Sequence, residues 1–555
     1  MDEQPSLDRL SRDELIELAR AQRDELESLR VQHEKGIRIT FRGKDVATGI
    51  AGKVQPRTSR HLAQYSVGSE DEQARNLVIE GENLQAMTTL YQDRGHVDLI
   101  LTDPPYNTGK GFRYNDRWDE DPNDPDLGPE VSPEDAGRRH TKWLHFMWPR
   151  LKVMLDMLKP EGVLAICIDD RELFRLGQVL DELFGEENRL AVINWQKIAA
   201  PKNDKTHVAA STEYVLVYAK DADLAKTTPL PRAENSFSRY KNPDNDPKGR
   251  WREHDLSART PSPPNTYGIQ SPFEGRIHYP PGQYSWRFPR RRIKSWLEEW
   301  GVQYVDHDIH DGKAPALLVK GGTAGELATD GRPGSRIGSV PQPAAETAKA
   351  RIARDNWPFV WFGLEGDGGP RVKRYMNEIR KGVVPTTYWA RDEYEFPLDL
   401  DSVSWDWEQS GLSQTGYKEL AAIVGKNHGF ETVKPLQLFT KIIQLWCPPD
   451  GLVMDPFAGS GTTGHAVLAM NNESGSSRRF ILMEQGRPDR GDPYAKSLLA
   501  NRLRRVVTGD WAAGPQPPAP GGYSFLQLQK EVDARALLEM ERDEMTVGDG
   551  RGWRG

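Results

Sequence analysis

The sequence predicts an α/β protein whose main sheet is largely parallel and carries helices on both faces. Short apolar runs alternate with helical segments over residues 76–220 and again over residues 426–510, and such alternation indicates parallel strands joined by helices. Two of these runs end abruptly, one in a pair of prolines and the other in a glycine-rich turn. Between the two blocks, residues 221–425 lose this rhythm, which predicts an inserted domain of a different, α+β kind.

The first block contains most of the expected elements. Its strands are expected at 76–79, 97–102, 163–168, 191–195 and 213–218, and its helices at 83–90, 143–158 and 172–184. In the second block, strands are expected at 452–455 and 479–484, and helices at 436–445 and 464–470. Each strand is a short apolar run bounded by turn residues, and each helix has apolar residues at three- and four-residue steps.

The ends of the chain are less regular. Residues 1–35 include leucines at helical spacing among many charges, which indicates an amphipathic helix; a short coiled coil and a helix packed on its own domain both fit. Residues 36–75 are polar, and we expect an irregular lead-in. Residues 511–555 begin with a Pro- and Gly-rich stretch, and we expect a charged helix near 524–543.

The bulk composition limits the classes of function. The 555 residues suffice for two or more domains, and the net charge of −8 means that a nucleic acid would be met by a local basic patch. There are two cysteines, Cys167 and Cys447, which excludes a disulfide scaffold or a cysteine zinc site and fits a reducing cytoplasm. No metal site is expected, and no apolar run is long enough to cross a membrane.

The first of the two turns is Asp103-Pro104-Pro105-Tyr106, which we call the proline turn. It follows the apolar run 97–102, and two prolines cannot continue a strand. An acid and an aromatic ring are therefore held at the carboxyl end of a strand, where open α/β sheets bind ligands. This pairing suits a planar, amine-bearing group such as a nucleobase turned out of its helix. An ordinary loop is the alternative, because Pro and Asp favour turns.

The second, residues 455–463, is Asp-Pro-Phe-Ala-Gly-Ser-Gly-Thr-Thr, which we call the glycine turn. Glycines let the backbone approach a ligand closely, and the helix that follows offers free N–H groups. Asp455 is placed to bind a cationic amine, and Glu484 ends the next strand, as expected where a ribose diol is held. A plain tight turn is the alternative. The absence of a phosphate-loop motif argues against an ATPase.

Together, the two turns resemble the amino-methylating DNA methyltransferases that use S-adenosylmethionine. The proline turn matches that family's catalytic motif, and the glycine turn matches its cofactor motif. The order, catalytic motif first, is similar to the permuted β class. Further segments are similar to the modification subunits of type III restriction systems; these are 76–84, 107–109, 112–116, 143–147 and 434–435.

The resemblance implies a Rossmann-like methyltransferase sheet with circularly permuted motif order, split into a catalytic half, 76–220, and a cofactor half, 426–510. It implies methyl transfer to adenine N6 of double-stranded DNA through a flipped base. The residues that it assigns to catalysis are Asp103, Pro104, Pro105 and Tyr106. Those that it assigns to the cofactor are Lys434, Asp455, Phe457, Gly459, Ser460, Gly461, Thr462 and Glu484. The acid at position 103 favours adenine, since relatives that act on cytosine N4 more often carry serine there.

Two groups of residues are candidates for holding DNA. Residues 107–138 form too long a connection for a structural link, so we expect a loop that closes over the substrate; its Phe112, Tyr114 and Trp118 are candidates to hold the base, or ordinary loop anchors. By analogy with the family, the insert 221–425 is a target-recognition domain. It interleaves cations with aromatic rings, and its expected DNA contacts are Arg287, Arg290, Arg291 and Arg292. The alternative is arginines that cover apolar rings on a surface.

Several readings stay open on sequence alone. A cytosine-N4 methyltransferase, a non-catalytic DNA-recognition subunit, and an enzyme acting on RNA or a small molecule all fit the same scaffold. No helicase or nuclease motif is visible, so cleavage would belong to a separate restriction subunit, and the chain could equally act alone. A homodimer is common among relatives of this class but does not follow from the sequence.

Overall fold

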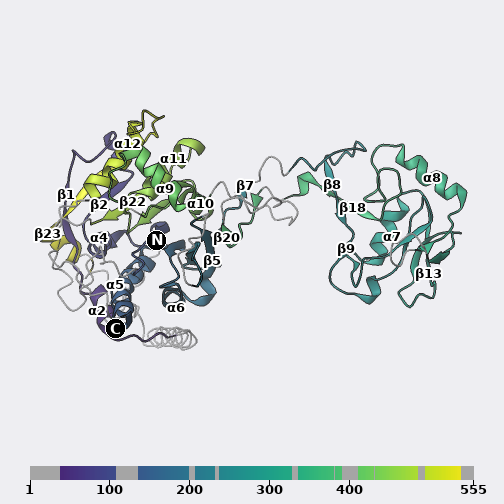
Figure 1. Ribbon diagram of the computed structural model, residues 1–555, viewed down its shortest axis with the longest axis horizontal. Helices are drawn as coiled ribbons and strands as arrows, with labels where there is room; N and C mark the ends of the chain where they lie inside the picture. The colour runs from purple at the N-terminus through teal and green to yellow at the C-terminus, as the bar shows by residue number, and fades with distance from the viewer. Residues whose placement is uncertain are drawn as a thin grey trace, which may run out of the picture. The chain divides into compact units, whose positions relative to one another are not determined.

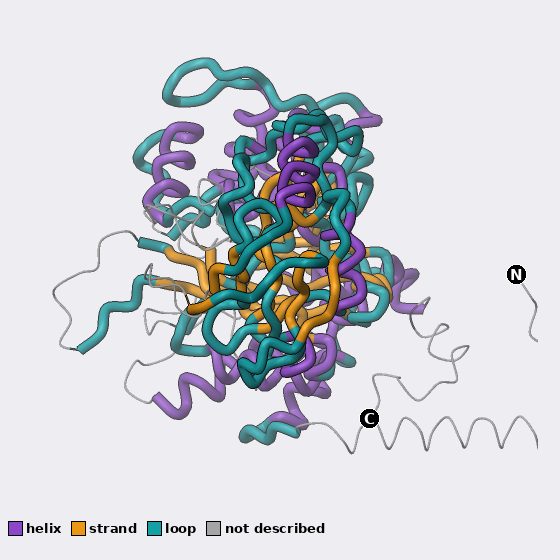
Figure 2. Tube along the Cα trace, turned by 90° about the vertical axis from the view of Figure 1, so that its right-hand side faces the viewer, coloured by secondary structure: helices purple, strands orange, loops and turns teal. Residues whose placement is uncertain are grey.

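A computed structural model describes residues 38–107, 136–198, 207–231, 237–327, 336–379, 382–389, 410–430, 432–485, 494–538 and 540. The chain divides into two compact units (Figure 1), one made of residues 1–230 and 384–555 and the other of residues 231–383. The helix expected within residues 1–35 lies outside the described residues. Both units contain helices and strands, as the sequence predicts, and Figure 2 shows the described chain coloured by these elements. No helix among the described residues is long and apolar enough to cross a membrane.

The first unit is built on a ten-stranded sheet in the order β1-β23-β2-β22-β21-β3-β4-β6-β5-β20. Its central strands, from β23 to β4, are all parallel to one another. The strands are β1 Arg57–His61, β2 Leu77–Glu80, β3 Val97–Thr102, β4 Leu158–Ile168, β5 Arg189–Gln196, β6 Thr212–Ala219, β20 Tyr388–Trp389, β21 Leu452–Asp455, β22 Arg479–Glu484 and β23 Ser524–Val532. This confirms the α/β fold class and the position of most expected strands.

Helices cover both faces of this sheet, because successive strand residues point to opposite sides. In β4, Val163 and Ala165 belong to one hydrophobic core and Leu164 and Ile166 to the other. The first core is completed by α10 Leu436–Trp446, α11 Thr462–Ser474 and α12 Asn501–Thr508. The second is completed by α2 Lys44–Ala51, α4 Asn83–Thr89, α5 Ala136–Met157 and α6 Leu173–Phe184. Figure 1 shows these two groups of helices on opposite sides of the strands. The unit also contains α3 Glu70–Gln73 and α9 Ser413–Val424.

Two expectations about the ends of the chain are wrong. Of the charged helix expected near 524–543, residues 524–532 form strand β23 and helix is found at 534–538, and the polar lead-in contains strand β1, which pairs with β23. In β23, Phe525 is buried while Lys530 and Glu531 are exposed, so the charges occupy one end of a half-buried strand. The sheet is also not wholly parallel, because β6 runs antiparallel to both β4 and β5.

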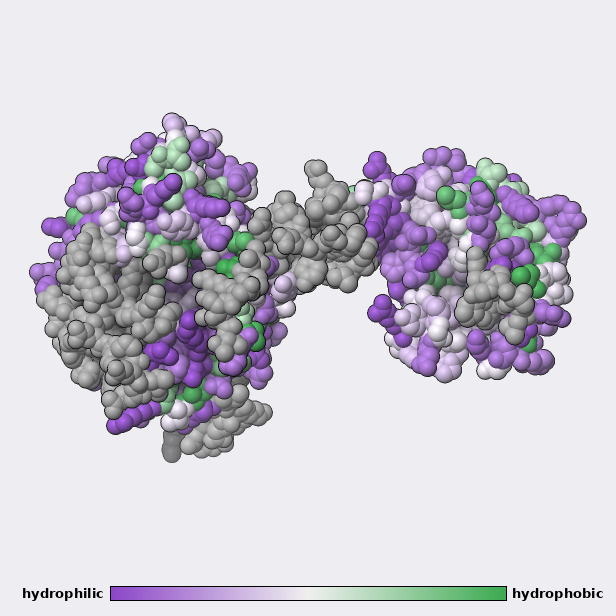
Figure 3. Space-filling model, viewed as in Figure 1, coloured by the Kyte–Doolittle hydropathy of each residue, from purple (hydrophilic) through white to green (hydrophobic). Residues whose placement is uncertain are grey.

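The second unit contains a six-stranded sheet in the order β13-β14-β10-β11-β16-β15 and a three-stranded sheet β17-β18-β8. The strands of the larger sheet are β10 Ile269–Gln270, β11 Arg276–His278, β13 Tyr304–His307, β14 Ala316–Val319, β15 Glu326–Leu327 and β16 Arg336–Ile337. The other elements are β8 Trp251–Asp255, β9 Ser257–Ala258, β12 Ser285–Trp286, α7 Arg290–Glu298, α8 Gln342–Ile352, β17 Val360–Trp361 and β18 Arg371–Tyr375, with β7 Leu230–Pro231 and β19 Gly382–Val383 at its boundaries. The face of this unit shown in Figure 3 is mostly hydrophilic, with small separate hydrophobic areas.

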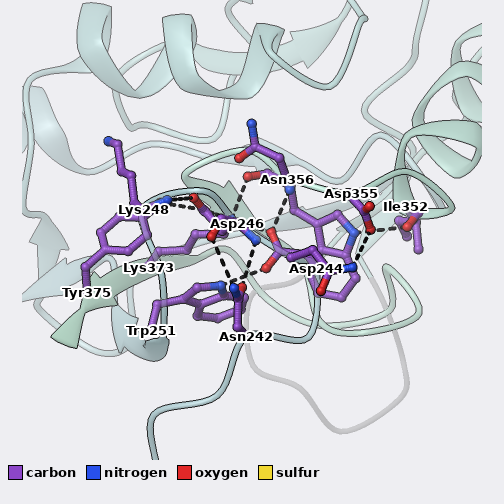
Figure 4. A network of polar contacts seen from close by, with 12 residues as sticks. Asn242, Asp244, Asp246, Lys248, Trp251, Ile352, Asp355, Asn356, Lys373 and Tyr375 are labelled. Atoms are coloured by element: carbon purple, nitrogen blue, oxygen red, sulfur yellow. Dashed lines mark hydrogen bonds and ion pairs between the residues drawn. The ribbon is translucent and has the colours of Figure 1, made fainter. Parts of the chain in front are cut away.

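A buried ion network stabilises the second unit (Figure 4). The Lys373 ammonium lies 2.5 Å from an Asp244 carboxylate oxygen and 2.6 Å from one of Asp246, and it also donates to the Trp357 carbonyl. The Trp251 indole donates to Asp244, and the Tyr375 hydroxyl donates to Asp246. Buried charges are tolerated only when paired and hydrogen-bonded in this way, so part of the cation–aromatic pattern in the insert belongs to its core.

Candidate active site

The proline turn and the glycine turn meet at one edge of the main sheet. They follow β3 and β21, which are parallel neighbours, with Met454 opposite Ile100. The carboxyl ends of parallel neighbours lie at the same edge, where α/β folds bind ligands. The Thr102 hydroxyl, one residue before the proline turn, donates a hydrogen bond of 3.0 Å to the Asp455 carboxylate. Segments more than 350 residues apart in the sequence are thus in direct contact.

Four side chains form a polar cluster around the proline turn. The Lys434 ammonium donates to both carboxylate oxygens of Asp103, at 3.0 and 2.8 Å, and to the Tyr106 hydroxyl at 2.8 Å. The Tyr106 hydroxyl donates to Asp103 at 2.5 Å. Glu213, at the start of β6, lies 3.1 Å from Lys434 and 3.2 Å from Lys197. The hydroxyl end of the tyrosine ring is therefore held in one orientation.

Burial and charge act together in this cluster. Burial alone would lower the pKa of Lys434, but the Asp103 and Glu213 carboxylates outweigh it and raise that pKa above its ordinary value. Burial would raise the pKa of Glu213, yet Lys434 and Lys197 hold it below its usual range. The pKa of Tyr106 is raised well above 10, first by burial and then by the adjacent carboxylates. The tyrosine thus stays a neutral hydrogen-bond donor, and Lys434 and Glu213 stay charged.

The backbone of the proline turn is fixed from two sides. The Trp143 indole of α5 donates to the Pro105 carbonyl at 2.7 Å. Asn107, directly after the turn, has a positive φ of 56° and donates its side-chain amide to the buried Glu172 carboxylate. The same carboxylate oxygen contacts His140 Nδ1 at 2.5 Å. Asparagine tolerates this left-handed conformation better than most residues, and the contact with Glu172 holds it there.

In the glycine turn, Asp455 is the central buried group. Its carboxylate accepts hydrogen bonds from the Thr102 hydroxyl, the Phe457 amide and the Thr463 hydroxyl. Burial, with a smaller contribution from the Asp103 charge, nevertheless raises its pKa from 3.8 to about 7, because these hydrogen bonds do not offset the lost solvation. A buried carboxylate of this kind is suited to bind a cationic group, whose charge would restore the ionised form.

The glycines of this turn are required by its backbone geometry. Gly459 and Gly461 have φ angles of 52° and 80°, which disfavour other residues. The Gly459 amide donates to the Glu484 carboxylate at 2.8 Å, and Gly461 precedes the first turn of α11. A Cβ atom on Gly459 would lie 3.1 Å from the Phe430 ring. Asp455 therefore begins the glycine turn, and Glu484, at the end of the neighbouring strand β22, is bonded to the same turn at Gly459.

Arg502 is a buried cation behind the glycine turn that the sequence did not point to. Its guanidinium donates to the hydroxyls of Ser460, at 3.1 Å, and Thr462, at 2.8 Å, and contacts His465 at 3.2 Å. Burial lowers the pKa of Arg502 to about 10 and keeps the pKa of His465 well below 6.5. These contacts hold the hydroxyls of Ser460 and Thr462 toward Arg502 on α12.

The structure brings most of the expected site residues to one edge. Lys434, expected beside the cofactor, contacts the proline turn instead of the glycine turn, and Phe457 is buried against the Phe146 ring at 5.9 Å. Glu213 was missed because a single acid at the start of a strand carries no sequence signal. Among the described residues, no group of His, Cys, Asp or Glu side chains could hold a metal ion. Phe112, Tyr114 and Trp118 lie outside the described residues.

The four candidate arginines of the insert lie at the start of α7 or just before it. Arg290 lies over the Tyr267 ring and pairs with Asp306, and Arg292 lies over the Trp296 ring at 4.8 Å. Arg287 donates weakly to the Ser257 carbonyl at 3.3 Å, and Arg291 is exposed. Arg290 and Arg292 therefore cover aromatic rings in this structure, as the alternative to DNA contact predicts.

Comparison with known proteins gives a family match that spans both turns. Residues 97–487 match the family described as DNA methylase. The type III restriction-modification enzyme StyLTI Mod subunit of Salmonella typhimurium is 31% identical over 484 residues, which cover 85% of this chain and 62% of that protein. The EcoPI Mod subunit of Escherichia phage P1 is 26% identical over 499 residues, covering 85% of this chain and 66% of that protein.

A relative of another type is also similar. The type II methyltransferase M.KpnI of Klebsiella pneumoniae is 27% identical over 400 residues, covering 71% of this chain and 76% of that protein. The chain thus spans only 62% and 66% of the length of the first two relatives. The family match over residues 97–487 spans both turns, and it confirms the family resemblance that the two turns predict.

Proposed function

We propose that this chain, which belongs to the DNA methylase family, transfers a methyl group from S-adenosylmethionine to adenine N6 in double-stranded DNA. The observation that carries this proposal is the hydrogen bond of 3.0 Å from Thr102, the last residue before the proline turn, to Asp455, the first residue of the glycine turn. It brings a turn suited to a cationic, diol-bearing cofactor next to a turn suited to a planar amine. Two such turns side by side are the minimum that a methyl transfer to a base requires.

The residues of the glycine turn fit S-adenosylmethionine. Asp455 would bind its ammonium group, since the buried carboxylate has a raised pKa of about 7 without a cation. Glu484 would hold the ribose hydroxyls, while Gly459, Ser460, Gly461, Thr462 and Phe457 would shape the pocket. When bound, the cofactor supplies an electrophilic methyl group on a cationic sulfur.

At the proline turn, the chain's own residues would hold the base. Tyr106, with its hydroxyl fixed by Asp103 and Lys434, offers its ring for stacking on the everted adenine. The Asp103 carboxylate and the Pro104 carbonyl accept the two hydrogens of the exocyclic amine. These two contacts would leave the lone pair of the amine nitrogen free to accept the methyl group that the cofactor supplies. The proton that the amine loses on methylation would pass to water. Positioning and fixed charges supply the rate enhancement.

Lys434 has a specific place in this proposal. Both carboxylate oxygens of Asp103 accept hydrogen bonds from the Lys434 ammonium. The amine of the base must therefore share one of these oxygens with Lys434 or displace the ammonium from it. Glu213, 3.1 Å from the same ammonium, can keep Lys434 paired while Asp103 turns to the base. We therefore assign Glu213 and Lys434 as positioning residues of the proline turn, in place of a cofactor contact for Lys434.

Adenine is favoured over cytosine because the first residue of the proline turn is an acid. We also propose that the insert recognises the target sequence, with Arg287 and Arg291 as candidate DNA contacts. Two similar proteins are Mod subunits of type III restriction-modification enzymes, so a separate restriction subunit is a proposed partner, and a homodimer is a second. The two buried, unpaired cysteines fit work in a reducing cytoplasm.

Sequencing of modified bases in DNA from cells with and without the gene tests the proposal. We expect N6-methyladenine at one recurrent sequence in the first DNA alone. Modified cytosine N4 at a recurrent sequence would overturn the adenine assignment. No difference between the two DNAs, although the protein is present, would support a non-catalytic recognition subunit.

A further inference from the structure

An exposed phenylalanine lies at the start of the helix that follows β4, the strand next to the one that ends in the proline turn. Phe174, on the first turn of α6, exposes 77% of its surface. Among the aromatic side chains of the described residues, only Tyr417 is also exposed, at 41%. A large apolar ring left in water on a folded surface is informative when it lies at a functional edge. The known packing of the unit gives this ring no role.

The position of Phe174 is fixed by its neighbours. Strand β4 lies next to β3 in parallel, so the chain leaves β4 at the same edge as the proline turn. Two residues before Phe174, the buried Glu172 carboxylate accepts a hydrogen bond from Asn107, which directly follows Tyr106. Phe174 thus lies on a helix whose N-cap residue, Glu172, is hydrogen-bonded to the side chain of the residue that directly follows the proline turn.

The surroundings of the ring suit a polyanion at this edge. Arg171 and Arg175 flank it, with side chains 47% and 42% exposed. Each arginine forms an ion pair with a nearby carboxylate, Arg171 with Asp169 and Arg175 with Glu172. These ion pairs restrict the positions of the two guanidinium groups. Phosphates that follow the sheet edge would meet cations on both sides of an apolar ring.

We infer that Phe174 inserts into the DNA base stack next to the target adenine and takes up the space that the everted base leaves. This rests on the proposed function, since it requires a base to be everted at the proline turn. A duplex loses stacking when a base leaves it, and apolar side chains inserted at base steps are a known way for proteins to stabilise such openings. Phe174 therefore lowers the cost of eversion and takes no part in the methyl transfer itself.

The test compares two DNA substrates with the full-length protein. One is a paired duplex carrying the sequence that the wild-type protein methylates on plasmid DNA, and the other is the same duplex with an abasic site opposite the target adenine. We expect Phe174→Ala to lower kcat/KM at least about tenfold on the paired duplex, the order of one lost base–aromatic stack. We expect a much smaller loss on the abasic duplex, because its adenine is already free of its partner.

The controls separate this role from others. Phe174→Trp should keep near wild-type rates on both substrates, and Phe174→Ala should bind S-adenosylmethionine as the wild type does. Leu224→Ala removes another exposed apolar side chain, 49% exposed, at the opposite edge, where Lys220 bonds to Gly162 near the start of β4; it should change neither rate. Equal loss on both duplexes, no loss on either, or a change of oligomeric state in Phe174→Ala would overturn the inference. A wild-type protein that methylates no sequence on plasmid DNA would instead refute the proposed function.

Discussion

Replacement of Asp455 by asparagine should stabilise the protein and at the same time weaken its cofactor binding. The carboxylate is buried, and its pKa is raised from 3.8 to about 7. About 3 pH units correspond to about 4 kcal/mol, the amount by which the ionised form is disfavoured in the folded state. Asparagine has a similar shape and no charge, so it removes this term while it keeps part of the hydrogen bonding with Thr102 and Thr463.

The sign of the pH dependence follows from the direction of the shift. The folded protein binds the Asp455 proton more tightly than the unfolded chain does, so stability falls as the pH rises between about 4 and 7. Above pH 7 both states are ionised and the loss is constant. Relative to the wild type, the Asp455→Asn variant should therefore gain roughly 3 kcal/mol between pH 5 and pH 8. Lost hydrogen bonds offset this by about 1 kcal/mol at every pH.

Thermal unfolding of both proteins at pH 5 and pH 8 measures the effect. Subtracting the free energy of unfolding of the wild type from that of the variant removes the contributions of the other titrating groups. Calorimetric titration with S-adenosylmethionine is the second half of the assay: wild-type affinity should rise as the pH passes through 7, and the variant should bind weakly with no such rise. A variant that is less stable than the wild type at pH 8 would contradict the raised pKa of Asp455 in the folded protein. A difference in stability that does not change with pH would contradict it as well.

Three further changes test other parts of the account. Tyr106→Ala should lower methyl transfer by roughly 100-fold through the lost stacking while S-adenosylmethionine binding, followed by calorimetry, stays nearly intact; equal loss of both would contradict the assigned role. Glu213→Gln should lower kcat and leave cofactor affinity unchanged, because Lys434 then has only Asp103 as an ionised partner in its cluster; steady-state kinetics showing a pure KM effect would count against it. Lys373→Met should destabilise the second unit by about 3–5 kcal/mol, since it leaves Asp244 and Asp246 as buried unpaired charges. Scanning calorimetry should show this loss, whereas the exposed neighbour Arg374→Met should show none.

The sequence predicted those parts of the site that depend on local patterns. The strands before Asp103 and Asp455 are short apolar runs, and each ends in residues that cannot continue a strand, so both the strand and its end are visible in a window of ten residues. The parallel arrangement then brings the two ends to one edge. The parallel arrangement is itself predicted by the alternation of strands and helices along the sequence.

The parts that the sequence did not predict depend on contacts between distant residues. Glu213 and Arg502 reach the site from elements whose own sequences carry no sign of it. Strand β23 was expected to be a helix because Lys530 and Glu531 are charged, yet pairing with β1 and β2 determines its conformation. Tertiary pairing of this kind overrides local preference.

Transfer of a labelled methyl group in vitro tests the central claim most directly. Purified protein is incubated with plasmid DNA and S-adenosylmethionine labelled in the methyl group, and the DNA is then digested to nucleosides. We expect label in N6-methyladenine with the wild type and almost none with Tyr106→Ala, although both proteins bind the cofactor. Label in cytosine, or a wild-type protein that binds the cofactor and labels no base, would contradict it.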